Sequence, residues 1–158
     1  MSVRRPPPWA WLFATAALAY AVDRATKQWA ESALAGRPPI VLIPRVLQLS
    51  YTTNSGGAFG LGQSAWWLFA AATIGVSVLI VFAAFRVRRV ATAVGLGLVL
   101  GGALGNLTDR IANADIPLHG RVVDFIDLHV WPVFNLADSA IVIGALLLAL
   151  FATRREDG

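Results

Sequence analysis

Acidic and amide side chains gather in one part of this apolar chain, between Gly101 and Ile141. They include Asn106, Asp109, Asp124, Asp127, Asn135 and Asp138. Asp138 opens an apolar run long enough to lie in a membrane, where inserting a carboxylate costs about 2.5 to 3.5 kcal/mol. An unpaired Asp138 without a function would be costly, so we interpret this region as the functional site.

Two carboxylates in a water-poor setting can divide the work of hydrolysis. Repulsion and desolvation raise one pKa, so one acid stays protonated while the other is ionised. The ionised group can take a proton from an attacking water. The protonated group can polarise a peptide carbonyl and pass a proton to the leaving amine. The proton belongs to the pair, so the sequence assigns it to neither aspartate.

The composition indicates an integral membrane protein. Hydrophobic residues make up 57% of the chain and charged residues only 14%, against about 25% in soluble domains. The 13 basic residues are scattered at segment ends, which argues against a nucleic-acid partner. Cysteine is absent and there are two histidines, so we expect no metal and no cofactor.

Four apolar segments predict an all-α membrane protein of one domain over residues 1–158, with four transmembrane helices near 9–28, 64–85, 90–110 and 131–152. The first also resembles a signal peptide with a cleavage-like Ala19-Tyr20-Ala21, but its helical pattern continues beyond that site, which favours a retained helix. Gly101 and Gly105 in the third segment predict close packing against a neighbouring helix.

Two segments between the helices are more polar. Residues 36–60 contain prolines, glycines and an alternating run from Val46 to Thr53, which predicts a small half-buried sheet at the membrane surface. Residues 112–124 form the connection before the fourth helix.

The basic residues set the orientation. Four spans put seven of them beside the termini and the Arg86 to Arg89 turn, and six on the other side. Arg24, Lys27 and Arg110 lie beside acidic residues, in segments expected to continue the helices. When these three are not counted, seven basic residues lie on the side of the termini and three on the other side. Both termini are therefore expected in the cytoplasm, and all six tryptophans then fall at segment ends.

That topology brings Asp124 and Asp138 to similar depth near the outer boundary. Asn135 and Asp138 share one face of the fourth helix, and Asn106 faces the same way as Arg110 on the third. Asp23 and Lys27, four residues apart, can pair on the first helix. The plainer interpretation is a polar network that only holds the helices together.

Five motifs, in order, resemble those of the lipoprotein signal peptidases, also called signal peptidase II. They are Asp23-Arg24-x-x-Lys27, Asn54-x-Gly56-x-Ala58-Phe59, Gly105-Asn106-x-x-Asp109-Arg110, Val123-Asp124-Phe125 and Phe134-Asn135-x-Ala137-Asp138-Ser139. The resemblance covers nearly the whole chain.

The resemblance implies a bacterial inner-membrane aspartic endopeptidase that cuts prolipoproteins before a diacylglyceryl-modified cysteine. It implies that Asp124 and Asp138 are catalytic, and that a group of polar residues lines or braces the site: Asn54, Asn106, Arg110, Asn135, Asp23 and Lys27. It also implies an extracytoplasmic β-cradle and a loop over the active site within 112–124. Expected partners are prolipoprotein signal peptides and membrane lipids, with the chain acting as a monomer.

Two other classes of protein remain open from the residues alone. A small four-helix proton-coupled transporter would use a membrane aspartate as a relay, although such an acid is expected near mid-membrane. A non-enzymatic scaffold of glycine-packed helices leaves the polar cluster unexplained. Asp127 also competes with Asp124 by position, and we expect it to be structural.

Overall fold

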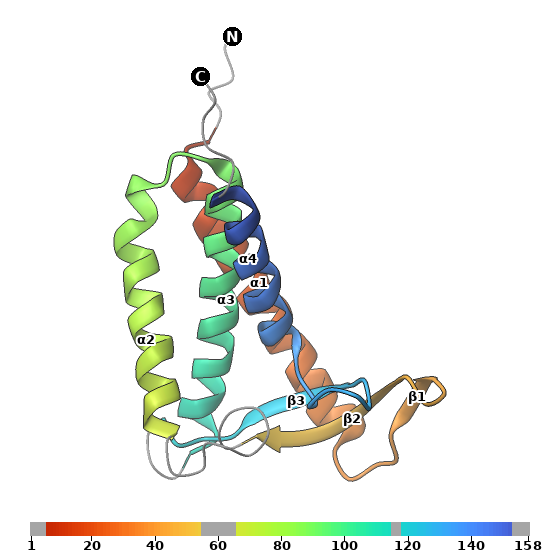
Figure 1. The fold of residues 1–158 in the computed structure, drawn as a ribbon. Helices are drawn as coiled ribbons and strands as arrows, with labels where there is room; N and C mark the ends of the chain where they lie inside the picture. The colour runs from red at the N-terminus through yellow and green to blue at the C-terminus, as the bar shows by residue number, and fades with distance from the viewer. Residues whose placement is uncertain (1–5, 55–65, 115–117, 153–158) are drawn as a thin grey trace.

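The computed structural model describes residues 6–54, 66–114 and 118–152, and these contain four long helices and a three-stranded sheet. The helices are α1 (Pro8–Leu34), α2 (Trp66–Ala83), α3 (Val90–Ala112) and α4 (Leu136–Ala152). A 3-10 turn, η2 (Ala84–Arg86), follows α2. The helices run alongside one another with the sheet across one end, while α1 begins and α4 ends at the other (Figure 1).

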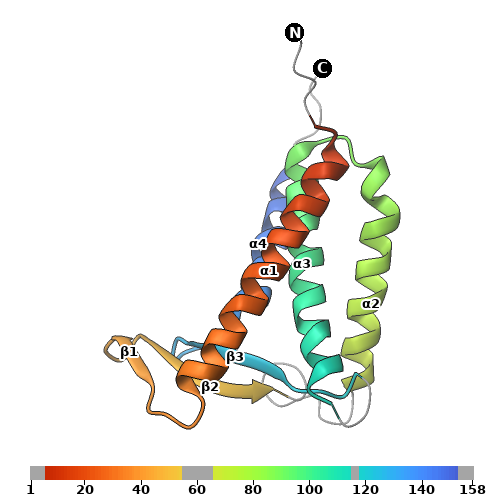
Figure 2. The same ribbon diagram turned by 180° about the vertical axis from the view of Figure 1, so that it is seen from behind.

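Helix α3 lies at the centre and packs along α1 and α4 (Figure 2). Its glycines allow this closeness. A Cβ on Gly101 would lie 2.5 Å from the Ala16 carbonyl oxygen and 2.7 Å from Ala19 Cβ, both on α1. A Cβ on Gly105 would meet Asp23, also on α1. The close packing predicted from this glycine pair is confirmed.

Helix α2 stands at the edge of the bundle and carries large exposed apolar side chains, including Leu79 and Phe82. Within the described residues, two helices are long and apolar enough to cross a membrane, Trp67–Arg86 and Val90–Ala112. Leu136–Phe151 is a shorter apolar helix. Apolar surface of this extent is typical of contact with lipid.

The sheet is antiparallel in the order β1 (Ile40–Ile43), β2 (Leu47–Asn54) and β3 (Val122–Asp127). The first two strands lie inside the predicted sheet segment 36–60, whose last six residues fall outside the described residues. Leu49 and Tyr51 of β2 pack with Phe125 of β3 against Ala30 and Leu34 at the end of α1. The sheet is thus anchored to the helix bundle.

Strand β3 was not predicted, because residues 112–124 were expected to be a loop. Its pairing partners are more than 65 residues away in sequence, and the ladder joins Asn54 to Val122 and Thr52 to Asp124. A strand that forms by pairing with a distant segment has only a weak strand pattern in its own sequence.

Helix α4 begins at Leu136, later than the expected residue 131. The chain just before it pairs with the sheet instead, since Phe134 and Ile126 exchange backbone hydrogen bonds of 2.8 and 3.0 Å. Helix α1 extends to Leu34, beyond the expected end at residue 28, because Ala30 and Leu34 are buried under the sheet.

Candidate active site

The first turn of α4 is held by a reciprocal pair of hydrogen bonds. Asn135 precedes the helix, and its Oδ1 accepts a hydrogen bond from the Asp138 backbone nitrogen at 2.9 Å. Asp138 Oδ2 in turn accepts one from the Asn135 backbone nitrogen at 3.2 Å. This is a capping box, in which side chains satisfy amides that the helix leaves unpaired. It fixes the Asp138 carboxylate at the positive end of α4.

Asp124 lies on β3, beside the same helix end, with only 3% of its surface exposed. Asn135 Nδ2 donates to Asp124 Oδ1 at 2.7 Å, and the Asn54 side chain from β2 also donates to this carboxylate. Burial, and then the negative charge of Asp138, raise the pKa of Asp124 to about 7. Asn135 is hydrogen-bonded to the carboxylates of both Asp124 and Asp138.

Asn106 of α3 is oriented by a lysine. Lys27 Nζ donates to Asn106 Oδ1 at 2.8 Å, and an ammonium group can only donate. The amide nitrogen of Asn106 must therefore point the other way, and it donates to Asp138 Oδ1 at 2.8 Å. Lys27 thereby sets the direction of the hydrogen bond that reaches Asp138.

Beneath these residues lies a cluster of two acids and two bases, of which Asp23, Lys27 and Asp109 are buried and Arg24 is partly exposed. Lys27 Nζ is 2.9 Å from Asp23 Oδ2 and 2.9 Å from Asp109 Oδ2, and Arg24 pairs with Asp109. The predicted Asp23–Lys27 pair is confirmed, and both side chains are almost completely buried. Two positive charges balance two negative ones, which lowers the cost of burying them.

The buried charges also hold the backbone of the site. Asp23 Oδ1 accepts a hydrogen bond from the Ala137 nitrogen at 3.0 Å, in the first turn of α4. Asp109 Oδ2 accepts one from the Val123 nitrogen at 3.2 Å, immediately before Asp124. The cluster therefore connects α1 and α3 to both segments that carry the two carboxylates.

Asp124 and Asp138 line one cavity of about 340 Å³ between α2, α3, β3 and the segment before α4. The other lining residues are Asn54, Phe69, Thr73, Asn106, Arg110, Val122, Trp131, Pro132, Val133 and Phe134. The guanidinium of Arg110 is buried, and its Nη1 has no hydrogen-bond partner among the described residues. A cationic residue with one unpaired donor atom thus lines the same cavity as the two carboxylates.

The structure brings all eight predicted site residues into this cavity or its buried support. Asn54, Asn106, Arg110, Asp124 and Asp138 line the cavity. Asn135 and Lys27 bind residues that line it, and Asp23 binds Lys27 and the Ala137 backbone next to Asp138.

Asp127 is turned away from the cavity. It accepts hydrogen bonds from Gln48 Nε2 at 2.7 Å and from the His129 nitrogen at 2.8 Å. Both bonds hold the sheet and the turn after β3, as expected for a structural acid. They also lower the pKa of Asp127.

Sequence reasoning placed Asp109 in the polar region as a supporting residue and gave Arg24 no role of its own, although both lie in the motifs. The spacing along each helix indicates that both belong to the site. Arg24 lies three residues before Lys27 and Asp109 three after Asn106, so each shares a helix face with a residue of the site.

In the part of the chain that the structure describes, there is no group of three or more acidic or histidine side chains arranged to hold a metal ion. The chemistry available in the cavity is that of a carboxylate pair, two asparagine amides and a guanidinium. Such a set can activate water and stabilise a polarised carbonyl.

The arrangement of four helices, a small sheet and a polar cavity is that of a membrane enzyme. A solved bacterial membrane enzyme matches this chain with a TM-score of 0.76 and 28% identity, covering 93% of each chain. A second solved structure, also described as a bacterial membrane enzyme, gives the same TM-score and identity over 90% of this chain and 92% of that one.

Residues 15–154 match the family described as signal peptidase (SPase) II. Among its relatives, the lipoprotein signal peptidase of Pelotomaculum thermopropionicum is 44% identical over 140 residues, covering 87% of this chain and 88% of that protein. That of Streptomyces coelicolor is 42% identical over 146 residues, covering 92% and 72%. This chain therefore belongs to the signal peptidase II family, whose members are aspartic peptidases.

Proposed function

We propose that this chain cuts the signal peptide from prolipoproteins immediately before a cysteine that carries diacylglycerol, using Asp124 and Asp138 as its catalytic pair. The observation that carries this proposal is the joint exposure of the two carboxylates to one cavity, with Asn135 bonded to both. A peptide carbonyl in that cavity would meet both acids.

The two acids have different surroundings, which suits different roles. Asp124 is buried and has a pKa raised to about 7, so a substantial fraction of this carboxyl group is protonated at neutral pH. Asp138 is half-buried at the positive end of α4 and accepts hydrogen bonds from Asn106 and from the Asn135 backbone. Asp138 is therefore the base and Asp124 the acid.

The reaction uses one water molecule. Asp138 takes a proton from water as the water oxygen bonds to the scissile carbonyl carbon, while protonated Asp124 donates a hydrogen bond to the carbonyl oxygen. When the tetrahedral intermediate collapses, the carbon–nitrogen bond breaks and the leaving amine receives a proton from the pair. One proton remains shared by Asp124 and Asp138, so the enzyme is ready for another cycle.

Arg110 positions the substrate in this mechanism. Arg110 lines the cavity and its buried Nη1 has no partner among the described residues, so its guanidinium donates to a main-chain carbonyl oxygen of the bound peptide. Its positive charge also offsets the negative charge that develops on the intermediate.

The location of the cavity suits a substrate that resides in lipid. With all four helices spanning the membrane and both termini in the cytoplasm, the sheet and the cavity lie near the extracytoplasmic face of the inner membrane. Trp131, 61% exposed at the cavity mouth, suits the interfacial depth. An apolar groove of about 430 Å³ shares Trp131, Phe134 and Asp138 with the cavity and extends along α4 to Val142 and Ile143. Apolar parts of the substrate can reach Asp138 from lipid through this groove.

The proposed substrate is tested by cleavage with purified full-length protein in detergent. We expect a diacylglyceryl-modified prolipoprotein to be cut once, with the modified cysteine at the new N-terminus by mass spectrometry. The same prolipoprotein without the lipid is the matched control and should be cut much more slowly. Equal cleavage of both, or cleavage at another bond, would contradict the proposal.

A further inference from the structure

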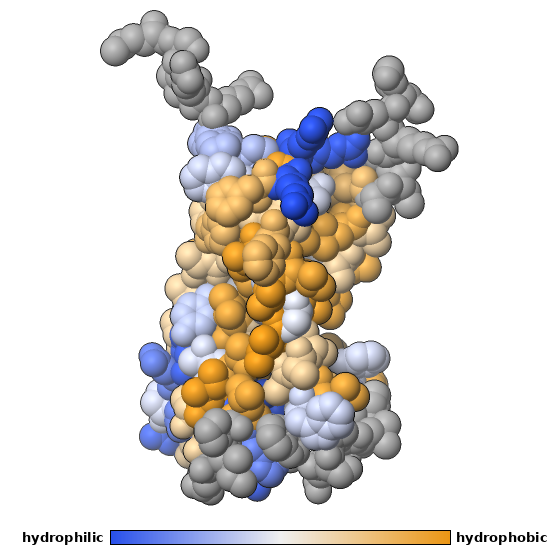
Figure 3. Space-filling view, turned by 90° about the vertical axis from the view of Figure 1, so that its left-hand side faces the viewer, coloured by the Kyte–Doolittle hydropathy of each residue, from blue (hydrophilic) through white to orange (hydrophobic). Residues whose placement is uncertain are grey.

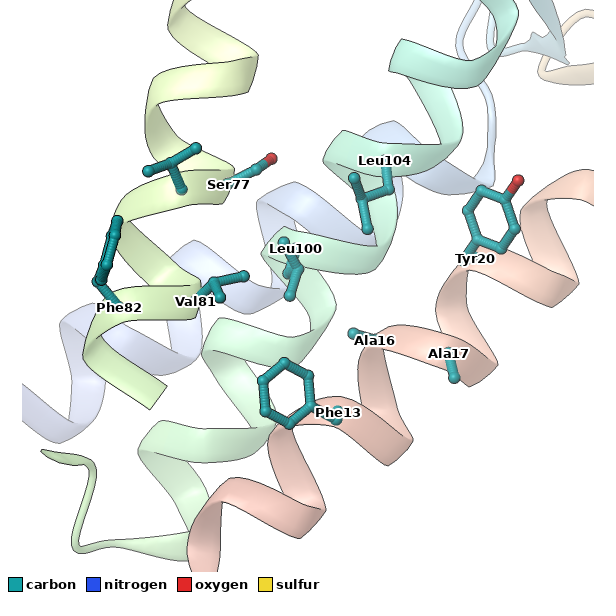
Figure 4. A pocket seen from close by; sticks show the side chains of 10 residues that line it. Phe13, Ala16, Ala17, Tyr20, Ser77, Val81, Phe82, Leu100 and Leu104 are labelled. Carbon is teal, nitrogen blue, oxygen red and sulfur yellow. The ribbon is translucent and has the colours of Figure 1, made fainter. Parts of the chain in front are cut away.

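A third hollow lies on the side of α2 that faces α1. It has a volume of about 520 Å³ and is lined by three helices. Figure 4 shows Phe13, Ala16 and Ala17 on α1, Ser77 and Val81 on α2, and Leu100 and Leu104 on α3 around a common space. We call it the α1–α2 groove. None of its described lining residues belongs to the catalytic cavity.

The groove is built for an apolar occupant. Two side chains in its lining carry hydroxyl groups, and both hydroxyls have partners. Ser77 Oγ donates to the Thr73 carbonyl oxygen at 2.8 Å, and the Tyr20 hydroxyl lies 3.3 Å from Thr108 Oγ1. A polar ligand would therefore lose its hydration without gaining hydrogen bonds in return.

The length and the apolar lining of the groove suit a hydrocarbon chain. Along α1 the groove runs from Phe13 to Tyr20, about 10 Å at 1.5 Å per residue. A hydrocarbon chain fits along this length.

Two basic residues lie beyond one end of the groove. The lining residues Val81 and Phe82 on α2 are followed one turn later by Arg86, and Arg88 comes two residues further on. Both arginines are exposed. Figure 3 shows a strongly hydrophilic cap at the end where α2 passes into α3, above a mostly hydrophobic face.

The distances match one leaflet of a bilayer. Arg86 lies nine residues after Ser77, which corresponds to about 13.5 Å along a helix. Half of the hydrocarbon core of a bilayer is about 15 Å thick. Phe85 lies between, with its ring centroid 5.9 Å from that of Trp9 and 6.3 Å from that of Phe13. Aromatic side chains of this kind suit the depth of the lipid ester groups.

We propose that the α1–α2 groove binds one anionic phospholipid of the cytoplasmic leaflet, with an acyl chain between α1 and α2 and its phosphate on Arg86 and Arg88. The proposal rests on the proposed orientation, which puts these arginines at the cytoplasmic face. Helix α2 packs chiefly on α3, so this lipid fills its open side and supports it against α1.

The headgroup contact is tested by native mass spectrometry of the full chain with added phosphatidylglycerol or phosphatidylcholine. We expect one retained phosphatidylglycerol and weaker retention of phosphatidylcholine. The double variant Arg86→Gln/Arg88→Gln should weaken phosphatidylglycerol binding roughly thirtyfold, from about 1 kcal/mol for each basic residue. The matched control, Arg37→Gln/Arg45→Gln, removes two exposed arginines from the other end and should leave binding unchanged.

The acyl chain is located by photo-crosslinking in liposomes, with a phosphatidylglycerol that carries a diazirine midway along its chain. We expect adducts on Phe13, Val81 and Phe82. Ala17→Phe should fill the groove and abolish these adducts, whereas Ala14→Phe, at an exposed alanine of α1 outside the groove lining, should not.

Three results would overturn the proposal: adducts spread evenly over the lipid-facing helices, equal retention of the two lipids, or unchanged binding in the double arginine variant. Asp138→Asn separates this proposal from the proposed function, because it should abolish cleavage and leave lipid binding intact.

Discussion

Gly102 controls how closely α3 approaches the helix that carries Asp138. A Cβ at this position would contact the Ala137 carbonyl oxygen and lie 2.9 Å from Ile141 Cγ1, both on α4. Gly102 is also one turn from Asn106, whose amide donates to Asp138 Oδ1 at 2.8 Å. Gly102→Ala must therefore move α3 and α4 apart at the depth of this hydrogen bond.

The expected effect on activity exceeds the effect on stability. Overpacking lowers the free energy of unfolding by about 1 to 3 kcal/mol, and replacing a helical glycine by alanine raises it by about 0.5 to 1 kcal/mol. A displacement of a few tenths of an ångström to about 1 Å at a catalytic group lowers the rate by up to about 100-fold. We expect kcat for Gly102→Ala to fall roughly 10- to 100-fold in a protein that remains folded.

Two glycines supply matched controls. Gly97→Ala creates a similar clash, 2.8 Å from Thr15 Cβ, but against α1 at the end away from the carboxylates. Gly75→Ala meets open space and should be neutral or slightly stabilising. The assay is single-turnover cleavage, with thermal unfolding measured alongside. Equal loss of kcat in Gly97→Ala and Gly102→Ala, or full activity in Gly102→Ala, would refute this account of α3–α4 spacing.

Four further predictions follow from the charges and the chemistry of the site. The pKa of Asp124 is raised to about 7, so the stability and activity that depend on its protonated form are present at low pH and are lost as pH rises through about 7. We therefore expect kcat/KM to fall above this pH. Asn54→Ala removes a hydrogen bond that lowers this pKa, so the descending limb of the pH profile should move to higher pH, and a shift to lower pH would contradict the assignment. Lys27→Met leaves Asp23 with an uncompensated buried charge and should lower the free energy of unfolding by about 3 to 5 kcal/mol, measured by thermal unfolding. A decrease in this free energy below about 1 kcal/mol would mean that the fold does not require the pair. Adding EDTA should leave the cleavage rate unchanged, and inhibition reversed by a divalent metal would contradict a carboxylate-only mechanism.

Local sequence spacing was sufficient for several parts of the site. The Asp23–Lys27 pair follows from two residues four apart on a helix. The sequence Asn135-Leu136-Ala137-Asp138 has the spacing of a capping box, so it also carried the signal for the true start of α4.

Contacts between distant segments could not be read in this way. Arg24 and Asp109 pair across 85 residues of sequence, and only the packing of α1 on α3 selects that partner among several acids. Strand β3 exists because β2 lies beside it, and its six residues alone do not distinguish a strand from a loop. The bonding of Asn135 to both carboxylates likewise depends on where β3 meets α4.

The central claim, that Asp124 and Asp138 act together on the scissile bond, is tested most directly by single-turnover cleavage of a diacylglyceryl-modified prolipoprotein. We expect Asp124→Asn and Asp138→Asn each to abolish cleavage while thermal unfolding shows a folded protein. The control Asp127→Asn, on the same strand as Asp124 but outside the cavity, should retain activity. Cleavage at the parent rate by either of the first two variants would contradict the account.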